Sequence, residues 1–215
     1  MPFGDNFESL FPSYLVDSDK GRLRNSLKQF IGGELKNEID YSDFYKEYHY
    51  DYFMQSDLIR EIRFAYWDEE NKIFQKRYTD AIILSNTCDI SFDNNHSINE
   101  KQCLFAPVIE LADYIIDLIG AGLDQAKISQ FIKTIKSQQI TNILYLPANH
   151  NNSKEYVVLL DNVFWFPIKE LKQYTEDISS NKISSLGYFG YYLFILKLSY
   201  HLCRLPEQCD REVAA

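Results

Sequence analysis

The residues best suited to chemistry in this sequence follow a short apolar run near its middle. Residues 81–84, Ala-Ile-Ile-Leu, form a continuous hydrophobic stretch that is typical of a strand covered on both faces. Small polar residues end regular structure because their side chains bond to nearby main-chain groups. We therefore predict that a buried strand delivers a thiol and a carboxylate to its exit, where functional residues often lie. The residues at this exit are Ser85, Asn86, Thr87, Cys88 and Asp89.

Three interpretations of Cys88 are open. A cysteine attacks a substrate readily when its thiol pKa is lowered, for example by a neighbouring histidine or a helix N-terminus. Asp89 acts in the opposite direction, and the histidines lie in separate segments, at His49, His96, His150 and His201. The simplest interpretation is a buried, inert thiol with Asp89 capping the turn. The alternatives are a nucleophile, or a turn in which Ser85, Asn86 and Thr87 bind a ligand or partner.

Carboxylates supply a further set of candidate groups. Glu110, Asp113 and Asp117 are spaced i, i+3 and i+7, which places them on one face of a predicted helix. Three such groups can hold a divalent cation, but the same spacing is typical of a solvated helix face. We keep Glu110 as a binding candidate and predict no metal site and no cofactor. The sequence contains no phosphate loop, dinucleotide-binding fingerprint or hydrolase elbow.

Two segments are candidate surfaces for another protein or subunit. Residues 40–56 are rich in acids and aromatics, and the rings at 41, 44, 45, 48 and 52 recur at helical spacing. Tyrosine is favoured in interfaces, which makes Tyr45 and Tyr48 binding candidates; the alternative is a stripe packed on the core. The second segment is the mostly apolar helix predicted over 188–205, because such a helix is buried or meets another chain.

The surrounding segments predict how these residues are positioned. Strands are expected over 58–67, 73–84, 102–106, 143–146, 156–160 and 163–166, with a helical pair inserted over 109–139. Sequential short strands favour an antiparallel meander that curls on itself. We predict an α+β fold: a small antiparallel β-barrel with the inserted helices and with helices at both ends. The expected organisation is one compact domain, with a helical arm at 1–56, a barrel core at 57–174, and a C-terminal helix and tail at 175–215.

The charge balance limits the classes of partner. The formal net charge is −9, which opposes binding to nucleic acid or to an anionic membrane. No apolar run reaches membrane-spanning length, and the first residues lack the pattern of a signal peptide. Four cysteines without paired spacing fit reduced thiols. We therefore expect a cytoplasmic protein.

The strand order resembles that of the PemK/MazF-like small β-barrels. Ser56-Asp57-Leu58-Ile59, then Ala81-Ile82-Ile83-Leu84-Ser85, then Phe105-Ala106-Pro107-Val108 resemble the family's opening, its second strand and its Val-x-Pro-Thr strand in that order. Residues 156–161 resemble its last core strand. The turn also resembles a Ser-x-x-Cys-Asp-Ile signature of uncharacterised bacterial proteins.

The resemblance implies a role in a prokaryotic stress, toxin–antitoxin-like or phage-defence system. The family's toxins cut single-stranded RNA with an arginine and a hydroxyl residue. Here Thr79 stands at the arginine position, Ile109 or Glu110 stands at the threonine position, and Arg77 lies two residues before Thr79. We therefore expect a non-catalytic protein-interaction or ligand-binding module. The alternatives are a diverged endoribonuclease that uses Arg77, and a cysteine-dependent enzyme centred on Cys88 and Asp89.

Overall fold

The computed structural model describes residues 21, 39, 41–92, 101–149 and 153–203. Several predictions lie outside these residues: most of the helical arm at 1–56, the end of the C-terminal tail from residue 204, and both His96 and His150. The candidate site residues named above are all described.

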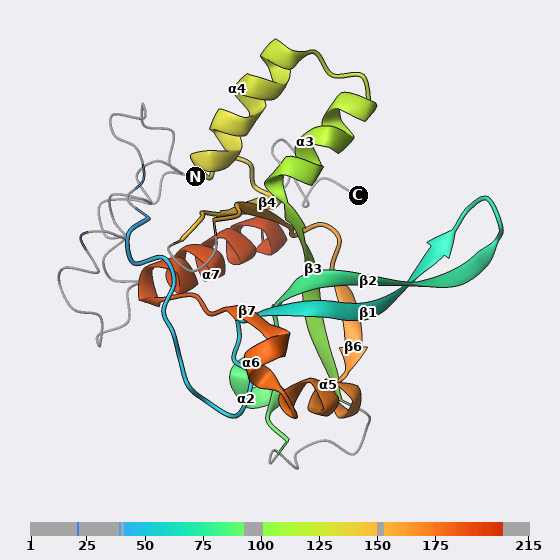
Figure 1. Ribbon diagram of the computed structural model, residues 1–215, viewed down its shortest axis with the longest axis vertical. Helices are drawn as coiled ribbons and strands as arrows, with labels where there is room; N and C mark the ends of the chain where they lie inside the picture. The colour runs from blue at the N-terminus through green and yellow to red at the C-terminus, as the bar shows by residue number, and fades with distance from the viewer. Residues whose placement is uncertain (1–20, 22–38, 40, 93–100, 150–152, 204–215) are drawn as a thin grey trace, which may run out of the picture.

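Seven strands of the described chain form one antiparallel sheet (Figure 1). The strand order is β4-β5-β3-β2-β1-β7, and β6 pairs with β3 beside that path. The long strand β3 is shared, because its start pairs with β6, its middle with β2 and its end with β5. The bounds are β1 Leu58–Asp68, β2 Ile73–Ile83, β3 Gln102–Glu110, β4 Ile143–Leu146, β5 Tyr156–Leu159, β6 Phe164–Pro167 and β7 Lys182–Ser184.

The predicted buried strand is confirmed. Ala81, Ile82 and Ile83 lie in β2 between β1 and β3, and all three are buried. Because side chains alternate across a strand, Ile82 joins one hydrophobic cluster, while Ala81 and Ile83 join another on the opposite face. The continuous apolar run thus reflects a strand covered on both sides.

The α+β class is confirmed, but hydrogen bonds between the described strands do not close the sheet into a barrel. The edge of β4 is instead blocked by a side chain. Gln138, which is fully buried, donates from Nε2 to the Tyr145 carbonyl at 2.6 Å and accepts from the Tyr145 N–H at 3.1 Å. On the other side of the bent sheet β6 leans on β1, where the rings of Phe64 and Phe164 lie 4.9 Å apart.

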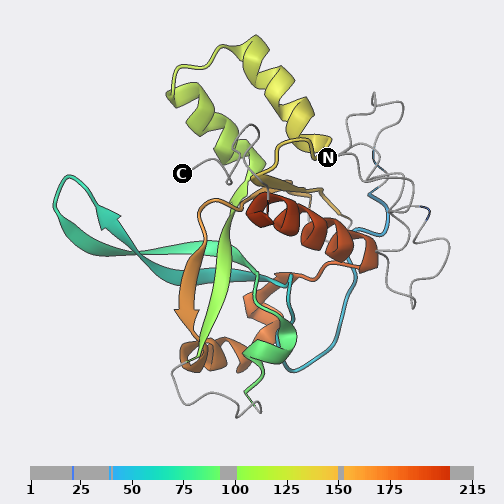
Figure 2. The ribbon, with the colours of Figure 1, turned by 180° about the vertical axis from the view of Figure 1, so that it is seen from behind.

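The helices cover the sheet and extend beyond it. The predicted inserted pair is confirmed as α3 and α4, which stand out at one end of the molecule, and α7 lies across one face of the sheet (Figures 1 and 2). Phe189, Leu193 and Phe194 place α7 in the largest hydrophobic cluster, so much of this predicted partner surface is internal. The bounds are α2 Thr87–Ile90, α3 Leu111–Gly120, α4 Gln125–Lys136, α5 Ile168–Thr175, α6 Ile178–Asn181 and α7 Tyr188–Cys203.

The predicted helix over 40–56 is wrong, because residues 41–56 form turns and irregular chain. Main-chain bonds to a distant segment hold them: the Gly187 N–H donates to the Phe44 carbonyl at 2.9 Å, and the Lys46 N–H donates to the Ser185 carbonyl at 3.1 Å. A Cβ atom at Gly190 would lie 2.3 Å from the Phe44 oxygen, so glycine is needed for this approach. Aromatic and aspartate residues have modest helix propensity, and the tertiary pairing overrides it.

Candidate functional site

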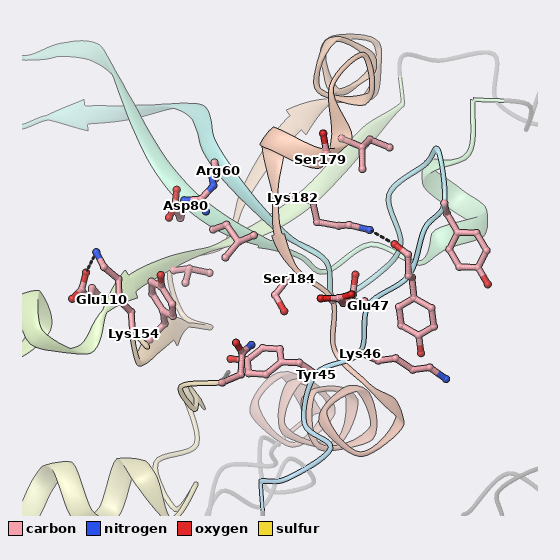
Figure 3. Close-up of a pocket in the computed structure, with 18 of the residues that line it drawn as sticks. Tyr45, Lys46, Glu47, Arg60, Asp80, Glu110, Lys154, Ser179, Lys182 and Ser184 are labelled. Carbon is pink, nitrogen blue, oxygen red and sulfur yellow. Dashed lines mark hydrogen bonds and ion pairs between the residues drawn. The ribbon is translucent and has the colours of Figure 1, made fainter. Parts of the chain in front are cut away.

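A groove of about 1010 Å³ lies where the sheet, β7 and the segment 45–51 meet (Figure 3). Its lining comes from parts of the chain that are distant in sequence, from Tyr45 to Ser185. Three of the predicted binding residues, Tyr45, Tyr48 and Glu110, are among them. The groove carries charges of both signs. The charged lining residues are Lys46, Glu47, Asp51, Arg60, Asp80, Glu110, Asp113, Lys154 and Lys182.

One wall is the aromatic segment. The Tyr45 hydroxyl donates to the Pro147 carbonyl at 2.9 Å, and burial raises the pKa of this phenol. Beyond it the rings of Tyr48, Tyr50 and Tyr52 stack, with centroids 5.9 and 5.1 Å apart. Stacking of alternate residues indicates that this stretch is extended, although it belongs to no β-ladder. The Lys46 ammonium lies 5.5 Å from the centre of the Tyr48 ring.

The opposite wall is built by an irregularity in the sheet. The β1–β2 register shifts between Ile59 and Ile62, and Glu61 takes a positive φ of 51°. Such a bulge re-aims side chains. Asp80 Oδ1 accepts a hydrogen bond from the Glu61 N–H at 3.1 Å, and Arg60 lies beside Asp80 in the groove (Figure 3).

An ion pair closes one end of the groove. Lys154 Nζ lies 2.7 Å from Glu110 Oε2, and this contact raises the pKa of Lys154. Glu110 is the N-cap residue of α3, so its position is fixed by the junction of β3 and that helix. Lys182 Nζ, from β7, donates to the Tyr48 carbonyl at 3.1 Å (Figure 3).

A buried carboxylate lies next to the Ser185 end of the groove. Asp57 is buried, and its Oδ2 accepts from the Met54 N–H at 2.9 Å. Within the described chain, Asp57 Oδ1 and Ser185 Oγ have no hydrogen-bond partner. Burial raises the pKa of Asp57, and the nearby Ser185 hydroxyl opposes this rise. Asp57 Oδ1 and Ser185 Oγ nevertheless do not form a hydrogen bond with each other. Buried polar atoms are normally satisfied, so this pair is unusual.

The predicted turn after β2 serves the fold and lies outside the groove lining. Ser85 Oγ accepts from the Leu104 N–H, and Thr87 Oγ1 accepts from the Gln55 N–H, both at 2.9 Å. Asn86, rather than Asp89, caps α2 by accepting from the Cys88 N–H at 2.9 Å. The interpretation of Cys88 as a buried thiol is wrong: of the two cysteines whose side chains are described, Cys88 is exposed and Cys103 is buried.

The three catalytic candidates are not brought together. Arg77 lies on the exposed part of β2, with its guanidinium 4.1 Å from the centre of the Tyr66 ring. Ile83 lies six positions further along the strand, or about 20 Å away, whereas Cys88 and Asp89 follow the far end of β2. Arg77 and Cys88 therefore cannot act on one small substrate in this arrangement.

Sequence reasoning missed Arg60, Asp57 and Lys182. A signal for Arg60 was present, because Ile59 and Ile62 are both apolar yet stand three positions apart. In a regular strand, residues three positions apart point to opposite faces. The side chains of Ile59 and Ile62 lie on one face in the structure, so this spacing indicates a bulge. We find no comparable signal for Asp57 or Lys182.

Comparisons with known proteins yield no relative: no protein-family model, curated protein or solved structure matches this chain. Across the described residues, no group of three or more His, Cys, Asp or Glu side chains is arranged to hold a metal ion. None of the helices in that part of the chain has both the length and the apolar character needed to span a membrane.

Proposed function

We propose that this chain is a binding module whose groove takes an extended segment of another protein. Following the resemblance to PemK/MazF-like barrels, we place it in a cytoplasmic prokaryotic stress, toxin–antitoxin-like or phage-defence system. In this proposal the groove recognises a partner and catalyses no reaction.

The observation that carries the proposal is the convergence of Tyr45, Tyr48 and Glu110 on one groove. Tyrosine combines large contact area with a hydrogen-bonding hydroxyl, which suits a protein interface. The stretch around Tyr48 is extended and belongs to no ladder, and because Lys182 Nζ already engages the Tyr48 carbonyl, its tyrosine side chains offer the contact surface. These features favour a polypeptide ligand over a small metabolite.

The charges of the groove indicate the composition of that ligand. Five carboxylates and four cations line it, so a segment carrying both signs matches it better than a uniformly charged polymer. Asp80 and Arg60 present one charge of each sign on the sheet wall (Figure 3). We expect basic side chains of the partner near Asp80, and acidic ones near Arg60.

The finer fold assignment is part of the proposal. The bent sheet, with Phe164 of β6 against Phe64 of β1, is consistent with a diverged barrel that has lost its closing hydrogen bonds. The strand order along the chain also fits the resemblance.

One observation favours RNA cleavage as a second candidate function. Thr79 and Glu110, at the positions of the family's arginine and hydroxyl residue, line the same groove. Arg60 lies there too, whereas Arg77 is absent from the lining. A diverged ribonuclease would therefore use Arg60 and the Thr79 hydroxyl.

A peptide-display selection separates the two functions. The wild-type chain and the variants Glu110→Lys and Tyr48→Ala are each used to select peptides from the same library, with exposed Lys133→Glu on α4 as a control. We expect mixed-charge sequences for the wild type and the control, a changed charge preference for Glu110→Lys, and weak enrichment for Tyr48→Ala. Identical selections by all four proteins would contradict the binding proposal.

RNA cleavage is measured in parallel on unstructured RNA, with Arg60→Ala and Thr79→Val as variants. We expect no cleavage by any of these proteins. Cleavage by the wild type that is lost in both variants would overturn the non-catalytic assignment and favour the second function.

A further inference from the structure

The β1–β2 hairpin extends beyond the body of the molecule as a two-stranded arm, residues 62–79 (Figures 1 and 2). At its base β3 pairs with β2 only over Asp80–Ile83, and β7 pairs with β1 only at Leu58 and Ile59. The outer edge of β2 over Ile73–Thr79 therefore has no ladder partner among the described strands. Unpaired strand edges are templates for another chain.

The two faces of the arm differ. Cross-strand partners share a face, so the pairs Trp67–Phe74 and Arg63–Tyr78 lie on the same side as Lys76. On this side Phe74 is 73% exposed, Tyr78 67% and Trp67 43%. The other side is partly engaged, because the Phe64 ring packs at a tilt against Phe164 and Arg77 lies over Tyr66. The arm thus presents one open aromatic face.

The arm is held in place at both ends. At the tip, Asp68 Oδ1 accepts from the N–H groups of Glu70 and Asn71, each at 3.0 Å. At the base, Arg63 pairs with Glu170 at 2.5 Å, and the Tyr174 hydroxyl donates to the Glu61 carbonyl at 3.1 Å. A pre-organised surface loses less entropy when it binds, which favours a role in recognition.

The charge of the β2 edge is opposite to that of the whole chain. Over Ile73–Thr79 the edge carries two cations, Lys76 and Arg77, and no carboxylate, whereas the chain carries −9 overall; Lys72, in the preceding turn, is paired with Glu69 at 2.6 Å. Lysine within an edge strand opposes pairing with an identical edge, because like charges would meet. The positive charges therefore disfavour pairing between this edge and the same edge of a second copy, and they are complementary to an acidic chain.

We propose that the arm binds an extended acidic segment of another protein, which adds as a strand to the outer edge of β2. Alternate side chains of that segment face Phe74 and Tyr78, and the intervening carboxylates lie near Arg77 on the other face. The unpaired row of main-chain donors and acceptors selects a polypeptide, since a nucleic acid strand offers no matching ladder. This surface meets the groove only at Thr79, which is part of the groove lining, and it does not depend on the function proposed for the groove.

The probe is a synthetic peptide in which glutamate alternates with tyrosine and valine, and binding is followed by fluorescence anisotropy. We expect binding that weakens about tenfold or more in the double variant Phe74→Ala/Tyr78→Ala and in Arg77→Glu. The matched controls, Trp165→Ala on β6 and Lys133→Glu on α4, should bind as the wild type does. Glu110→Lys in the groove should also leave this binding unchanged.

Further probes test the binding mode on the unmodified chain. A pair of peptides, N-methylated at the odd or at the even residues, should differ, because only alternate N–H groups of an added strand point toward β2: one of the two should lose binding and the other should keep it. The lysine-for-glutamate peptide and an oligothymidine strand should bind at least about tenfold more weakly. Equal binding of acidic and basic peptides, tighter binding of the oligonucleotide, or no binding of the acidic peptide would overturn the proposal. So would self-association that is lost in Phe74→Ala/Tyr78→Ala.

Discussion

Lys197 Nζ donates to Gln138 Oε1 at 2.8 Å and to the Gln138 main-chain carbonyl at 3.1 Å. Both residues are buried, and the same glutamine pairs with the N–H and carbonyl of Tyr145 on β4. A lysine of α7 thus supports the side chain that blocks the edge of the sheet. Burial lowers the pKa of Lys197 well below its usual value.

The first prediction concerns the pH dependence of stability. Because the pKa of Lys197 is lower in the folded chain, the unfolded chain binds more protons between the two pKa values, and the unfolding free energy rises with pH there. The wild type should therefore gain stability relative to Lys197→Met as pH rises toward the pKa of a lysine in the unfolded chain, about 10.4, measured by urea unfolding. Exposed Lys133→Met is the control, and its difference from the wild type should stay constant. A constant difference for Lys197→Met would contradict the prediction.

The second prediction concerns Gln138. Gln138→Ala removes one acceptor of Lys197 and both side-chain partners of Tyr145, so it should lower the unfolding free energy by about 3 kcal/mol or more. The neighbouring Gln139 is exposed, and Gln139→Ala should change it by less than about 0.5 kcal/mol. Thermal and urea unfolding measure both. Similar losses in the two variants would show that the side-chain hydrogen bonds of Gln138 contribute little to the unfolding free energy.

The third prediction distinguishes the cysteines. Cys88 is exposed and should be alkylated rapidly at neutral pH, whereas burial raises the pKa of the Cys103 thiol to about 12 and should restrict its labelling to unfolded molecules. Mass spectrometry of the digested protein follows each site, with Cys88→Ser as the control. A Cys88 rate near that of free cysteine would leave no support for an activated nucleophile, whereas rapid labelling of Cys103 would contradict the prediction.

Local patterns predicted the sheet and the inserted helices well, because the information lay in short stretches. The apolar run at Ala81 indicated burial on both faces, and the strands expected over 58–67 and 73–84 pair as the β1–β2 hairpin. The misassigned segment 40–56 shows where such patterns fail. Rings at positions 48 and 52 fit a helix, but those at 48, 50 and 52 also fit an extended chain, and the main-chain partner at Ser185 settles the choice. That contact is not visible in local periodicity.

The site was only partly predictable for the same reason. Tyr45, Tyr48 and Glu110 were chosen as single residues with interface or charge character, and only the folded chain brings them to one groove. By sequence, the residues after β2 are candidates for a binding turn as well as for a structural one, because their side chains are reactive or polar. Ser85, Asn86 and Thr87 instead satisfy main-chain donors.

The fourth prediction tests the contact that replaced the expected helix. Gly190→Ala would place a methyl group 2.3 Å from the Phe44 carbonyl oxygen, so the 44–46 segment must shift, at a cost of about 1–3 kcal/mol in unfolding free energy. Gly120→Ala, at the end of α3 with open space around it, is the control and should be neutral or slightly stabilising. Equal stability of the two variants would contradict the close approach.

The last prediction concerns Asp57 and Ser185, whose facing oxygens lack partners in the described chain. Asp57→Asn keeps an oxygen for the Met54 N–H and adds an amide donor for Ser185 Oγ, so it should raise the unfolding free energy by about 1 kcal/mol at neutral pH. Because burial raises the pKa of Asp57, the wild type loses stability as pH rises through that pKa. The advantage of Asp57→Asn should therefore shrink as pH falls toward about 4.

Urea unfolding at neutral pH and at about pH 4 measures the difference in unfolding free energy between Asp57→Asn and the wild type. Ser185→Ala, which removes one unpaired oxygen, is the companion variant. A large destabilisation by Asp57→Asn at neutral pH would show that the charge itself is required, with Lys182 as a cation that stabilises it. If Asp57→Asn is instead more stable but selects peptides less well, the carboxylate is retained at a cost to stability, which is expected of a group that serves binding.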